Sequence, residues 1–351
     1  MLYFQSFTLD ALALILRPQS LPQSLTDERR ARMRARQIFQ WVYQKGAVSW
    51  DEMTDLSKDL RSWLKENVAF YNINKKESKQ SIDGTHKFLW ELEDHKTIES
   101  VIIPANKEER ITACISTQVG CAMGCKFCLT GVQGLSRNLK TYEIIAQVYE
   151  LRKIAQVTNI VFMGMGEPLH NLENLITACQ ILLDPYSFGF SKRKVTVSTS
   201  GIVPAIEKLG KQISVSLAVS LNAVTDEKRS KIMPVNKKWN LALLLKACKD
   251  YSKCNRRITF EYVLLKDFND SLEDAARLVK LVRGIPCKIN LIPMNEHMGS
   301  VYKRPAETII RAFQKYLLDR HMTATVRISK GVEILAACGQ LSSVSQKTCV
   351  K

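Results

Sequence analysis

Two kinds of segment alternate along most of this 351-residue chain, and that alternation limits its fold more than any other feature. Short β-rich runs are followed by longer segments whose apolar residues recur at helical spacing. The β-rich runs are ACIST, NIVFMG, KVTVSTS, ISVSLAVSL, RITFEYVLL, KINLIPM and TATVRIS, and the helical segments include TYEIIAQVYELRKIAQ, NLENLITACQILL, NLALLLKACKDY, SLEDAARLVKLV and PAETIIRAFQKYLLDRH. Such alternation predicts βα units around a parallel sheet. About six units favour a partial (β/α)6 barrel of the TIM type over a complete eightfold one, with its site at the carboxyl ends of the strands.

The segments before this region predict a smaller helical domain and a connecting hairpin. Near the start, DERRARMRARQIFQWVYQKG combines an arginine-rich face with an apolar stripe, and Ser49 is placed to cap a following helix, with Glu52 three residues later. Residues 86–103 alternate apolar and polar side chains around a turn at 93–95, the pattern of a β-hairpin. The predicted organisation is a helical accessory domain (7–80), a β-hairpin linker (81–106), the barrel (107–341) and a tail (342–351).

The first residues carry no expected structural role. MLYFQS, residues 1–6, is similar to the remnant of a protease-cleavage tag, so we leave it out of the predicted fold. No apolar run approaches the ~20 residues needed to span a bilayer, and Asp10 interrupts the apolar stretch FTLDALALIL. The sequence therefore predicts a cytoplasmic protein whose thiols are kept reduced, and nothing in it asks for more than a monomer.

The charge of the chain points to a polyanionic partner. Lys and Arg outnumber Asp and Glu by 51 to 34, which gives a net charge of +17. Such an excess favours nucleic acid as the partner, and a basic but otherwise ordinary enzyme is the alternative. Arg29, Arg30, Arg32 and Arg34 are candidate contacts to nucleic acid, although a solvated helix face would have the same composition.

Three cysteines follow the first barrel strand with the spacing C-x3-C-x2-C: Cys121, Cys125 and Cys128. Three thiolates on one loop can each bind one corner of an iron–sulfur cube and leave the fourth iron without a protein ligand. A closed zinc site, the competing interpretation, needs four ligands and usually C-x2-C pairs. Glycines in the loop leave little side chain to bury free thiols, which disfavours a metal-free role. The spacing therefore favours a [4Fe–4S] cluster.

Two further features stand at the ends of predicted strands. FMGMGEP follows the second strand, where a glycine-rich turn lets backbone approach a ligand and Glu167 can bind an amine. Cys114 lies on the first strand, and Cys338 follows the last one in ILAACGQL. A lone cysteine is usually a small core residue, so neither thiol predicts chemistry by itself.

The cysteine spacing, with Phe127 before the last cysteine, resembles that of the radical S-adenosylmethionine (SAM) enzymes. From about residue 30 to residue 341 the chain resembles, within that group, the RlmN and Cfr family of RNA methyltransferases. The motifs that carry this resemblance are CISTQVGCAMGCKFCLTG, FMGMGEP, STSGIVP, SLNA, RSKIMPVN, NLIPMN and AACGQL. The resemblance implies a radical SAM barrel that holds a [4Fe–4S] cluster and SAM, and an N-terminal domain (7–80) that binds RNA.

The same resemblance implies how a methyl group reaches an electron-poor adenine carbon. The Cys338 thiolate takes a methyl group from one SAM, and a second SAM, cleaved by an electron that a cellular donor supplies to the cluster, yields the radical that removes a hydrogen atom from the S-methyl group. The resulting methylene radical adds to the adenine ring, and Glu99 is the proton acceptor. Cys114 then forms a transient disulfide with Cys338, which releases the product and is reset by a cellular thiol reductant.

By the same resemblance, seven residues line the SAM site: Gly166, Glu167, Ser198, Ser220, Leu221, Asn222 and Asn295. Many relatives have SLHA where this chain has SLNA, so Asn222 stands in place of a histidine. Asparagine still donates and accepts hydrogen bonds but does not titrate, which supports a binding role and not an acid–base role.

RlmN and Cfr modify different adenine carbons, carbon 2 and carbon 8. The segments RARQIFQWVYQKGAVSWDEMTDLSKDLR and VQGLSRNL look more like RlmN. That likeness implies carbon 2 of an adenosine in the peptidyl-transferase region of 23S ribosomal RNA, and of the adenosine 3′ of the anticodon in some transfer RNAs. Either base must leave its stack to reach a pocket. The alternatives are a Cfr-like carbon 8 enzyme and a non-catalytic metal-cluster protein that binds RNA, which would leave Cys114 and Cys338 unexplained.

Overall fold

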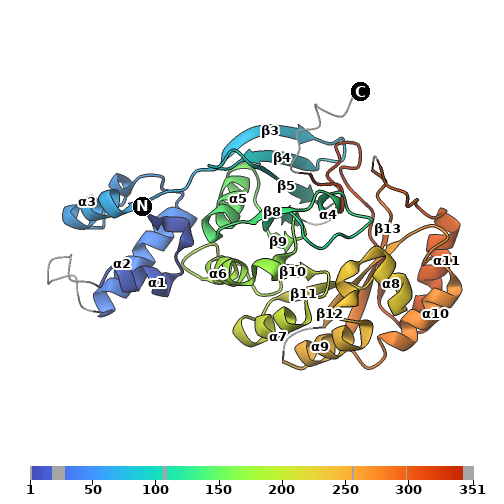
Figure 1. Cartoon of the computed structure of the whole chain (residues 1–351). Helices are drawn as coiled ribbons and strands as arrows, with labels where there is room; N and C mark the ends of the chain where they lie inside the picture. The colour runs from blue at the N-terminus through green and yellow to red at the C-terminus, as the bar shows by residue number, and fades with distance from the viewer. Residues whose placement is uncertain (1, 18–27, 106–108, 255–256, 298, 343–351) are drawn as a thin grey trace.

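A ten-stranded sheet is the frame of the described part of the chain (Figure 1). The structure is a computed structural model that describes residues 2–17, 28–105, 109–254, 257–297 and 299–342. Within these residues, parallel strands lie side by side in chain order, and each overlaps one of the predicted β-rich runs, although β6 ends at the second residue of ACIST. They are β6 (Ile111–Cys114), β9 (Asn159–Phe162), β10 (Val195–Thr199), β11 (Ser216–Ser220), β12 (Ile258–Leu264), β13 (Cys287–Pro293) and β14 (Ala324–Val326).

Helices connect consecutive parallel strands and pack along the outer side of the sheet (Figure 1). They are α5 (Thr141–Ile154), α6 (Leu172–Leu183), α7 (Val203–Gln212), α9 (Leu241–Cys254), α10 (Leu272–Leu281) and α11 (Glu307–Leu318). The short helix α8 (Asp226–Ile232) lies instead beside the loop of the spaced cysteines, where the Ile232 carbonyl oxygen accepts the backbone N–H of Lys126 over 2.9 Å. The sheet stays open, with β14 at one edge and β3 at the other, so the predicted partial barrel is confirmed. In the segments that the structure describes, no helix has the length and apolar character that crossing a membrane requires.

Three antiparallel strands extend the sheet beyond β6: β5 (Thr97–Pro104), β4 (His86–Glu91) and β3 (Asn74–Gln80). The predicted hairpin is confirmed as β4 and β5. The structure differs from the prediction in two places, because residues 74–80 form a strand and the hairpin belongs to the main sheet instead of linking two domains. The side chains of β3, NKKESKQ, are mostly exposed, so no alternating apolar pattern marks this strand in the sequence. Its lysines suit a sheet edge that must not pair with another chain.

The N-terminal module, residues 2–71, is helical as predicted. Its helices are α1 (Leu9–Ile15), α2 (Glu28–Phe39) and α3 (Lys58–Asn67). Ser49 and Glu52 form the expected capping box, but the helix that they begin is a 3-10 helix of only 3 residues. The helix α3 begins separately, after its own N-cap, Ser57.

Residues 2–6, which we left out of the predicted fold, are part of this module. The Phe4 side chain is fully buried, and its ring lies 5.6 Å from that of Phe39 and 5.9 Å from that of Trp50. Leu2 and Tyr3 form β1 and pair with a short strand, β2 (Val68–Ala69). An aromatic ring gains much from leaving water, so even a short apolar N-terminal run can join a core that has room for it.

The module packs against the barrel beside α5 and α6 (Figure 1). The Tyr43 ring lies 4.7 Å from the Phe188 ring, in the segment that follows α6. In the same place the Gln44 side-chain amide donates to the carbonyl oxygen of Pro185 over 2.8 Å. These contacts fix where the arginine-bearing helix α2 stands relative to the barrel.

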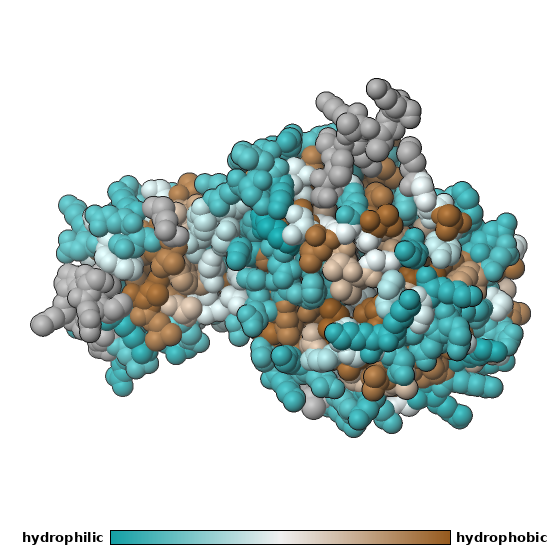
Figure 2. Space-filling view, in the orientation of Figure 1, coloured by the Kyte–Doolittle hydropathy of each residue, from teal (hydrophilic) through white to brown (hydrophobic). Residues whose placement is uncertain are grey.

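Several arginines of α2 stabilise the module itself. Arg32 forms an ion pair with Asp10 over 3.0 Å, and Arg34 donates to the carbonyl oxygen of Asp55 over 3.1 Å. Both contacts are exposed to solvent, which weakens them. The two arginines can therefore still attract a polyanion. Hydrophilic side chains cover much of the face that Figure 2 shows.

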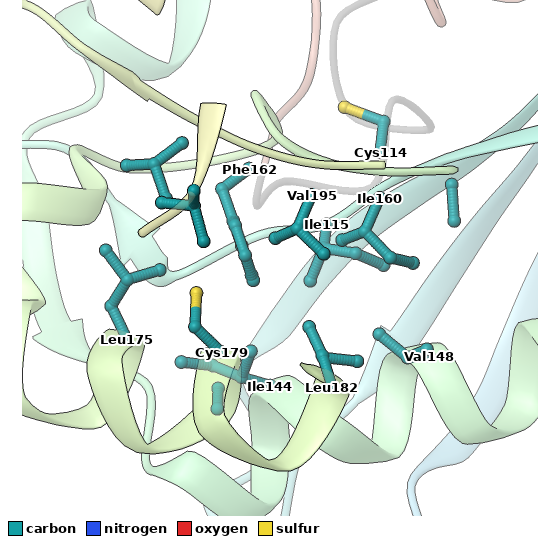
Figure 3. Close-up of a cluster of buried hydrophobic side chains, with 14 of the residues drawn as sticks. Cys114, Ile115, Ile144, Val148, Ile160, Phe162, Leu175, Cys179, Leu182 and Val195 are labelled. Atoms are coloured by element: carbon teal, nitrogen blue, oxygen red, sulfur yellow. The ribbon is translucent and has the colours of Figure 1, made fainter. Parts of the chain in front are cut away.

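The two faces of the parallel strands have different roles. Ile160 and Val195 point toward α5 and α6, where they meet Ile144 and Cys179 in an aliphatic core (Figure 3). Cys114, at the end of β6, extends to the other side of the strands (Figure 3). Successive strand residues point to opposite faces. Each strand therefore buries one set of side chains against the helices and presents the other set to the interior of the barrel.

Candidate active site

The loop that carries the three spaced cysteines starts and ends on a small antiparallel pair of strands. β7 (Gln118–Gly120) precedes the loop and β8 (Leu135–Asn138) follows it. The backbone N–H of Cys121 donates to the carbonyl oxygen of Gly134 over 2.8 Å. Only glycine fits at position 120, because a Cβ there would lie 1.9 Å from that same oxygen. The pairing closes the loop that carries the three thiols.

Cys121, Cys125 and Cys128 line one cavity, which we call the first cavity. Burial raises the pKa of the Cys121 thiol to about 12, and burial also raises the pKa values of Cys125 and Cys128. Metal binding at such thiols therefore releases protons. Among the described residues, no three His, Cys, Asp or Glu side chains converge where one metal ion would sit.

The glycine-rich turn after β9 forms another wall of the first cavity. Gly166 has φ of +99°, and a Cβ on it would lie 2.5 Å from the Gln118 side chain, so the turn needs glycine. Glu167 follows and is 4% exposed. Its carboxylate accepts the Thr199 hydroxyl and the backbone N–H of Ser200, each over 2.7 Å, and burial raises its pKa.

Ser198 on β10 and Ser220 on β11 also line the first cavity. A fully buried arginine, Arg229 on α8, holds the ends of these strands. Its guanidinium donates to the carbonyl oxygens of Ser200, Ser220 and Leu221 over 2.6, 2.9 and 3.0 Å. Backbone carbonyls that would otherwise point into the protein without donors are thus satisfied, which fixes the cavity wall.

Two of the predicted SAM-site residues, Leu221 and Asn222, do not line the first cavity and are fully buried beside it. Asn222 has φ of 58°. Its side chain accepts the backbone N–H of Val263 over 2.8 Å and donates to the Met233 sulfur at 3.3 Å. The asparagine therefore orders the turn after β11 through both ends of its amide.

Cys338 reaches the first cavity because the segment around it docks on the cysteine loop. The backbone N–H of Leu129 donates to the carbonyl oxygen of Gly339 over 2.8 Å. Asn295, which lines the same cavity, donates its side-chain amide to the Cys338 carbonyl oxygen over 3.0 Å. The cysteine loop, near the start of the barrel sequence, and Cys338, near its end, thus line the same cavity.

A second cavity adjoins the first, and Cys338 lines both. Cys114 lines the second cavity, where it is 5% exposed, and burial raises the pKa of its thiol to about 12. Three cationic side chains line this cavity as well: Arg110, Arg327 and Lys330. The structure therefore brings both predicted thiols to one cavity at the carboxyl ends of the strands.

Known proteins share this architecture in sequence and in structure. A family model described as the Radical SAM superfamily matches residues 115–279, and one described as the Ribosomal RNA large subunit methyltransferase N-terminal domain matches residues 14–70. The chain is 53% identical over 322 residues to a dual-specificity RNA methyltransferase RlmN from Geobacter sulfurreducens, covering 92% of this chain and 89% of the relative. The chain belongs to the RlmN family.

Another relative and a solved structure resemble the chain over most of its length. A dual-specificity RNA methyltransferase RlmN from Geotalea uraniireducens is 52% identical over 324 residues, covering 92% of this chain and 94% of the relative. A solved radical SAM methyltransferase from Sphaerobacter thermophilus superposes with a TM-score of 0.89 at 41% identity, covering 98% of this chain and all of that one.

Radical SAM enzymes such as the RlmN family use a [4Fe–4S] cluster and SAM, and the first cavity fits both. Its three thiols are soft donors, and an iron–sulfur cluster takes each cysteine on a different iron, so the ligands surround a group instead of meeting at one point. The cavity holds about 900 Å³ free of protein atoms, counting its open mouth. Five of the predicted SAM-site residues line it: Gly166, Glu167, Ser198, Ser220 and Asn295.

Glu99, the predicted proton acceptor, lies on β5 and lines neither cavity. One carboxylate oxygen lies 2.9 Å from the Lys87 ammonium, and the other accepts the backbone N–H of Ser342 over 2.9 Å. Burial raises the pKa of Glu99 and the ion pair with Lys87 opposes that rise. Its carboxylate thus anchors the segment that carries Cys338.

Three site residues escaped the sequence prediction: Arg229, Glu261 and Arg327. Glu261 lines the first cavity from β12, and Arg327, just past β14, lines the second. For Glu261 and Arg327 the signal in the sequence was a charged residue inside an apolar run, as in ITFEYVL, whereas Arg229 is the first residue of the motif RSKIMPVN. Such residues are rarely buried without a partner, so they mark places to examine.

Proposed function

We propose that this protein is a radical SAM methyltransferase that methylates carbon 2 of an adenosine in 23S ribosomal RNA and of the adenosine 3′ of the anticodon in some transfer RNAs. The position of Cys338, on the wall that the two cavities share, is the strongest support. A thiol there faces the cofactor on one side and a substrate base on the other. The names of the relatives, dual-specificity RNA methyltransferases, support the same substrate class.

In this proposal Cys121, Cys125 and Cys128 hold the cluster, and the first cavity holds SAM. The bound cofactors supply a methyl group and one-electron chemistry that can remove a hydrogen atom from a carbon. Cys338 contributes the acceptor: its thiol loses a proton, and its sulfur forms a bond to the methyl carbon of SAM as the bond from that carbon to the sulfonium sulfur breaks. The hydrogen bond from Asn295 to the Cys338 carbonyl holds that sulfur at the boundary of the cavities.

The second cavity receives the adenosine, which must first leave its base stack. Its cationic lining, Arg110, Arg327 and Lys330, suits the phosphates and polar edges that accompany the base. A net charge of +17 supplies long-range attraction to RNA, so binding should weaken steeply with salt.

Release of the product requires the second thiol. The radical that addition to the base creates gives up one electron, which the bound cluster would accept. The Cys114 thiol loses its proton, and its sulfur attacks the Cys338 sulfur to form a disulfide. The carbon–sulfur bond to the base breaks with its electron pair going to the former methyl carbon, which takes a proton to complete the new methyl group. Glu99, whose pKa is raised by burial, takes the proton of the ring carbon in this scheme after its ion pair with Lys87 opens. A cytoplasmic dithiol then reduces the disulfide, an electron donor of the cell serves the cluster, and the enzyme acts as a monomer.

The proposal is tested by an assay without oxygen. The purified protein is reconstituted with iron and sulfide, then incubated with SAM, a reductant and unmodified RNA, and the digested nucleosides are analysed by mass spectrometry. We expect 2-methyladenosine from both a 23S fragment and a transfer RNA with adenosine 3′ of its anticodon. Appearance of 8-methyladenosine would replace the carbon 2 assignment with the Cfr-like one, and no methylated adenosine from a SAM-cleaving protein would refute the RNA substrate.

A further inference from the structure

Glu261 is a buried carboxylate in the first cavity with one oxygen that no donor reaches. Its side chain is 7% exposed, and Oε1 has no hydrogen-bond partner among the described residues. The other oxygen accepts the Ser198 hydroxyl over 3.2 Å. The Arg327 guanidinium approaches Oε1 only to 3.8 Å, beyond hydrogen-bond distance.

A buried carboxylate oxygen without a hydrogen-bond donor destabilises the folded protein unless a bound molecule supplies the donor. Such an oxygen has lost its contacts to water and gained nothing in their place. Glu167, the other carboxylate of the same cavity, shows the contrast, because both of its oxygens accept donors from Thr199 and Ser200. Glu261 is therefore built to receive a donor from a bound molecule.

The two carboxylates stand at different ends of the cavity. The backbone N–H of Glu167 donates to the Gln118 side chain over 2.8 Å, and Gln118 lies on β7, the strand that leads into the cysteine loop. Glu261 instead lies 3.8 Å from Arg327, which lines the second cavity, so Glu167 is at the cluster end and Glu261 is at the far end. The amino and carboxylate groups of SAM are polar groups that can act as metal ligands, which suits them to the cluster end. The nucleoside then extends toward Glu261.

The neighbours of Glu261 select which nucleoside group it meets. Ser220 pairs with Glu261 in register on the adjacent strand, so their side chains stand on the same face of the sheet. Two positions further along β12, Val263 lines the cavity, and Ile292 does so from β13. Apolar side chains suit the flat adenine ring, and the carboxylate with its serines suits the hydroxyl groups of the sugar.

We propose that Glu261 binds the ribose hydroxyl groups of SAM through Oε1 and so makes the cofactor site selective for a ribonucleoside. The inference rests on the SAM site of the proposed function. Arg327, on the side of the second cavity, offsets the negative charge of Glu261 and connects this contact to the cavity that contains Cys114 and Cys338.

The test measures binding, not methylation. The reconstituted protein is dialysed to equilibrium without oxygen against SAM, 2′-deoxy-SAM and 3′-deoxy-SAM, and the same is done for Glu261→Gln and for Glu173→Gln, an exposed carboxylate on α6. For the unaltered protein we expect at least one deoxy analogue to bind roughly ten- to a hundredfold more weakly than SAM, because a hydrogen bond to a charged group is lost. Glu261→Gln should weaken SAM by a similar factor and discriminate less against that analogue, while Glu173→Gln should bind like the unaltered protein.

Three results would overturn the inference. Equal binding of SAM and both deoxy analogues by the unaltered protein would refute the inference. This comparison needs no variant, so the inference can be tested even if Glu261→Gln does not fold. Undiminished discrimination in a folded Glu261→Gln would show that the sugar is recognised elsewhere. Failure of the unaltered, reconstituted protein to bind SAM at all would remove the proposed function together with this inference.

Discussion

Cys114 and Cys338 line the same cavity, although Cys114 ends the first parallel strand and Cys338 follows the last one. Parallel strands place all their carboxyl ends on one side of the sheet, so a residue that ends β6 and a segment that leaves β14 can meet there. The docking of the Cys338 segment on the cysteine loop completes the approach. Two cysteines that are far apart in the chain therefore line one cavity, as the proposed disulfide requires.

Substitution of these two thiols should separate two stages of the reaction. We expect Cys338→Ala to abolish methylation and to leave the cluster intact, because no sulfur remains to accept the methyl group. Cys114→Ala should instead accumulate a covalent protein–RNA species, since nothing attacks the Cys338 sulfur. Denaturing gels and nucleoside mass spectrometry distinguish the two outcomes. Cys287→Ala, at the amino end of β13, is the matched control and should methylate normally; a fully active Cys338→Ala would refute the assignment.

Replacement of Gly166 by alanine should damage the SAM site. The added Cβ would lie 2.5 Å from the Gln118 side chain, at a backbone φ of +99° that alanine rarely adopts. The strain costs about 1–3 kcal/mol, and relief of it must move the turn that presents Glu167. We expect weaker SAM binding by equilibrium dialysis and a lower unfolding midpoint. Gly189→Ala provides the control, because its φ of +67° is also strained but its Cβ meets no atom within 4 Å; equal SAM binding by both variants would contradict the role of the turn.

Arg137 should protect the hairpin turn against acid. Its guanidinium donates to Asp94 over 2.7 and 3.0 Å and to Glu143 over 2.8 Å. The hydrogen bond from Arg137 lowers the pKa of Asp94 to about 2. A lowered folded-state pKa adds stability above the unfolded value near 4, and that stability is lost as the pH falls from about 4 to 2.

We therefore expect Arg137→Lys to cost about 1–3 kcal/mol at neutral pH, because lysine does not reproduce the forked geometry. The difference in free energy of unfolding from the unaltered protein should shrink between about pH 4 and pH 2. Urea denaturation across this pH range measures it. Arg277→Lys, in an exposed pair with Glu273, should change stability by about 0.5 kcal/mol or less. A difference for Arg137→Lys that does not vary with pH would contradict the role of Asp94.

Phe4 should matter for the stability of the N-terminal module. Its ring is fully buried among aromatic side chains, so Phe4→Ala should cost about 3–5 kcal/mol. Thermal or urea unfolding followed by tryptophan fluorescence reports on the module through Trp50, whose ring contacts Phe4. Leu2→Ala, at a side chain that is 51% exposed, is the control. If Phe4→Ala unfolds with the unaltered midpoint, residues 2–6 add nothing to the fold.

Local patterns predicted the parts of the fold that depend on neighbours in the chain. β12 and α10 appear in the sequence as an apolar run and an amphipathic repeat, because their burial follows the strand and helix periods. The edge strand β3 has no such signal, since its side chains are mostly in solvent and its backbone pairs with β4 through groups that every residue has. Its existence depended on a partner strand and not on its own composition.

The candidate site divides in the same way. The cysteine loop was predictable because its three thiols lie within a few residues of one another, and their spacing alone indicates a cluster. The role of Arg229 was not predictable, because it depends on the carbonyl oxygens that the guanidinium reaches at the ends of other strands. Glu261 was not, because its importance lies in an oxygen that the folded chain leaves without a donor.

The sequence by itself determined that this chain forms βα units, that three cysteines share a loop, and that Cys114 and Cys338 stand beside strands. Only the tertiary structure decided that Cys338 separates two cavities, that Glu99 anchors the Cys338 segment, and that Glu261 faces the cofactor side with an open oxygen. The physical reason is range. Helical hydrogen bonds and hydrophobic periodicity relate residues that are close in the chain, whereas a cavity is defined by the packing of strands and loops that the chain brings together from far apart.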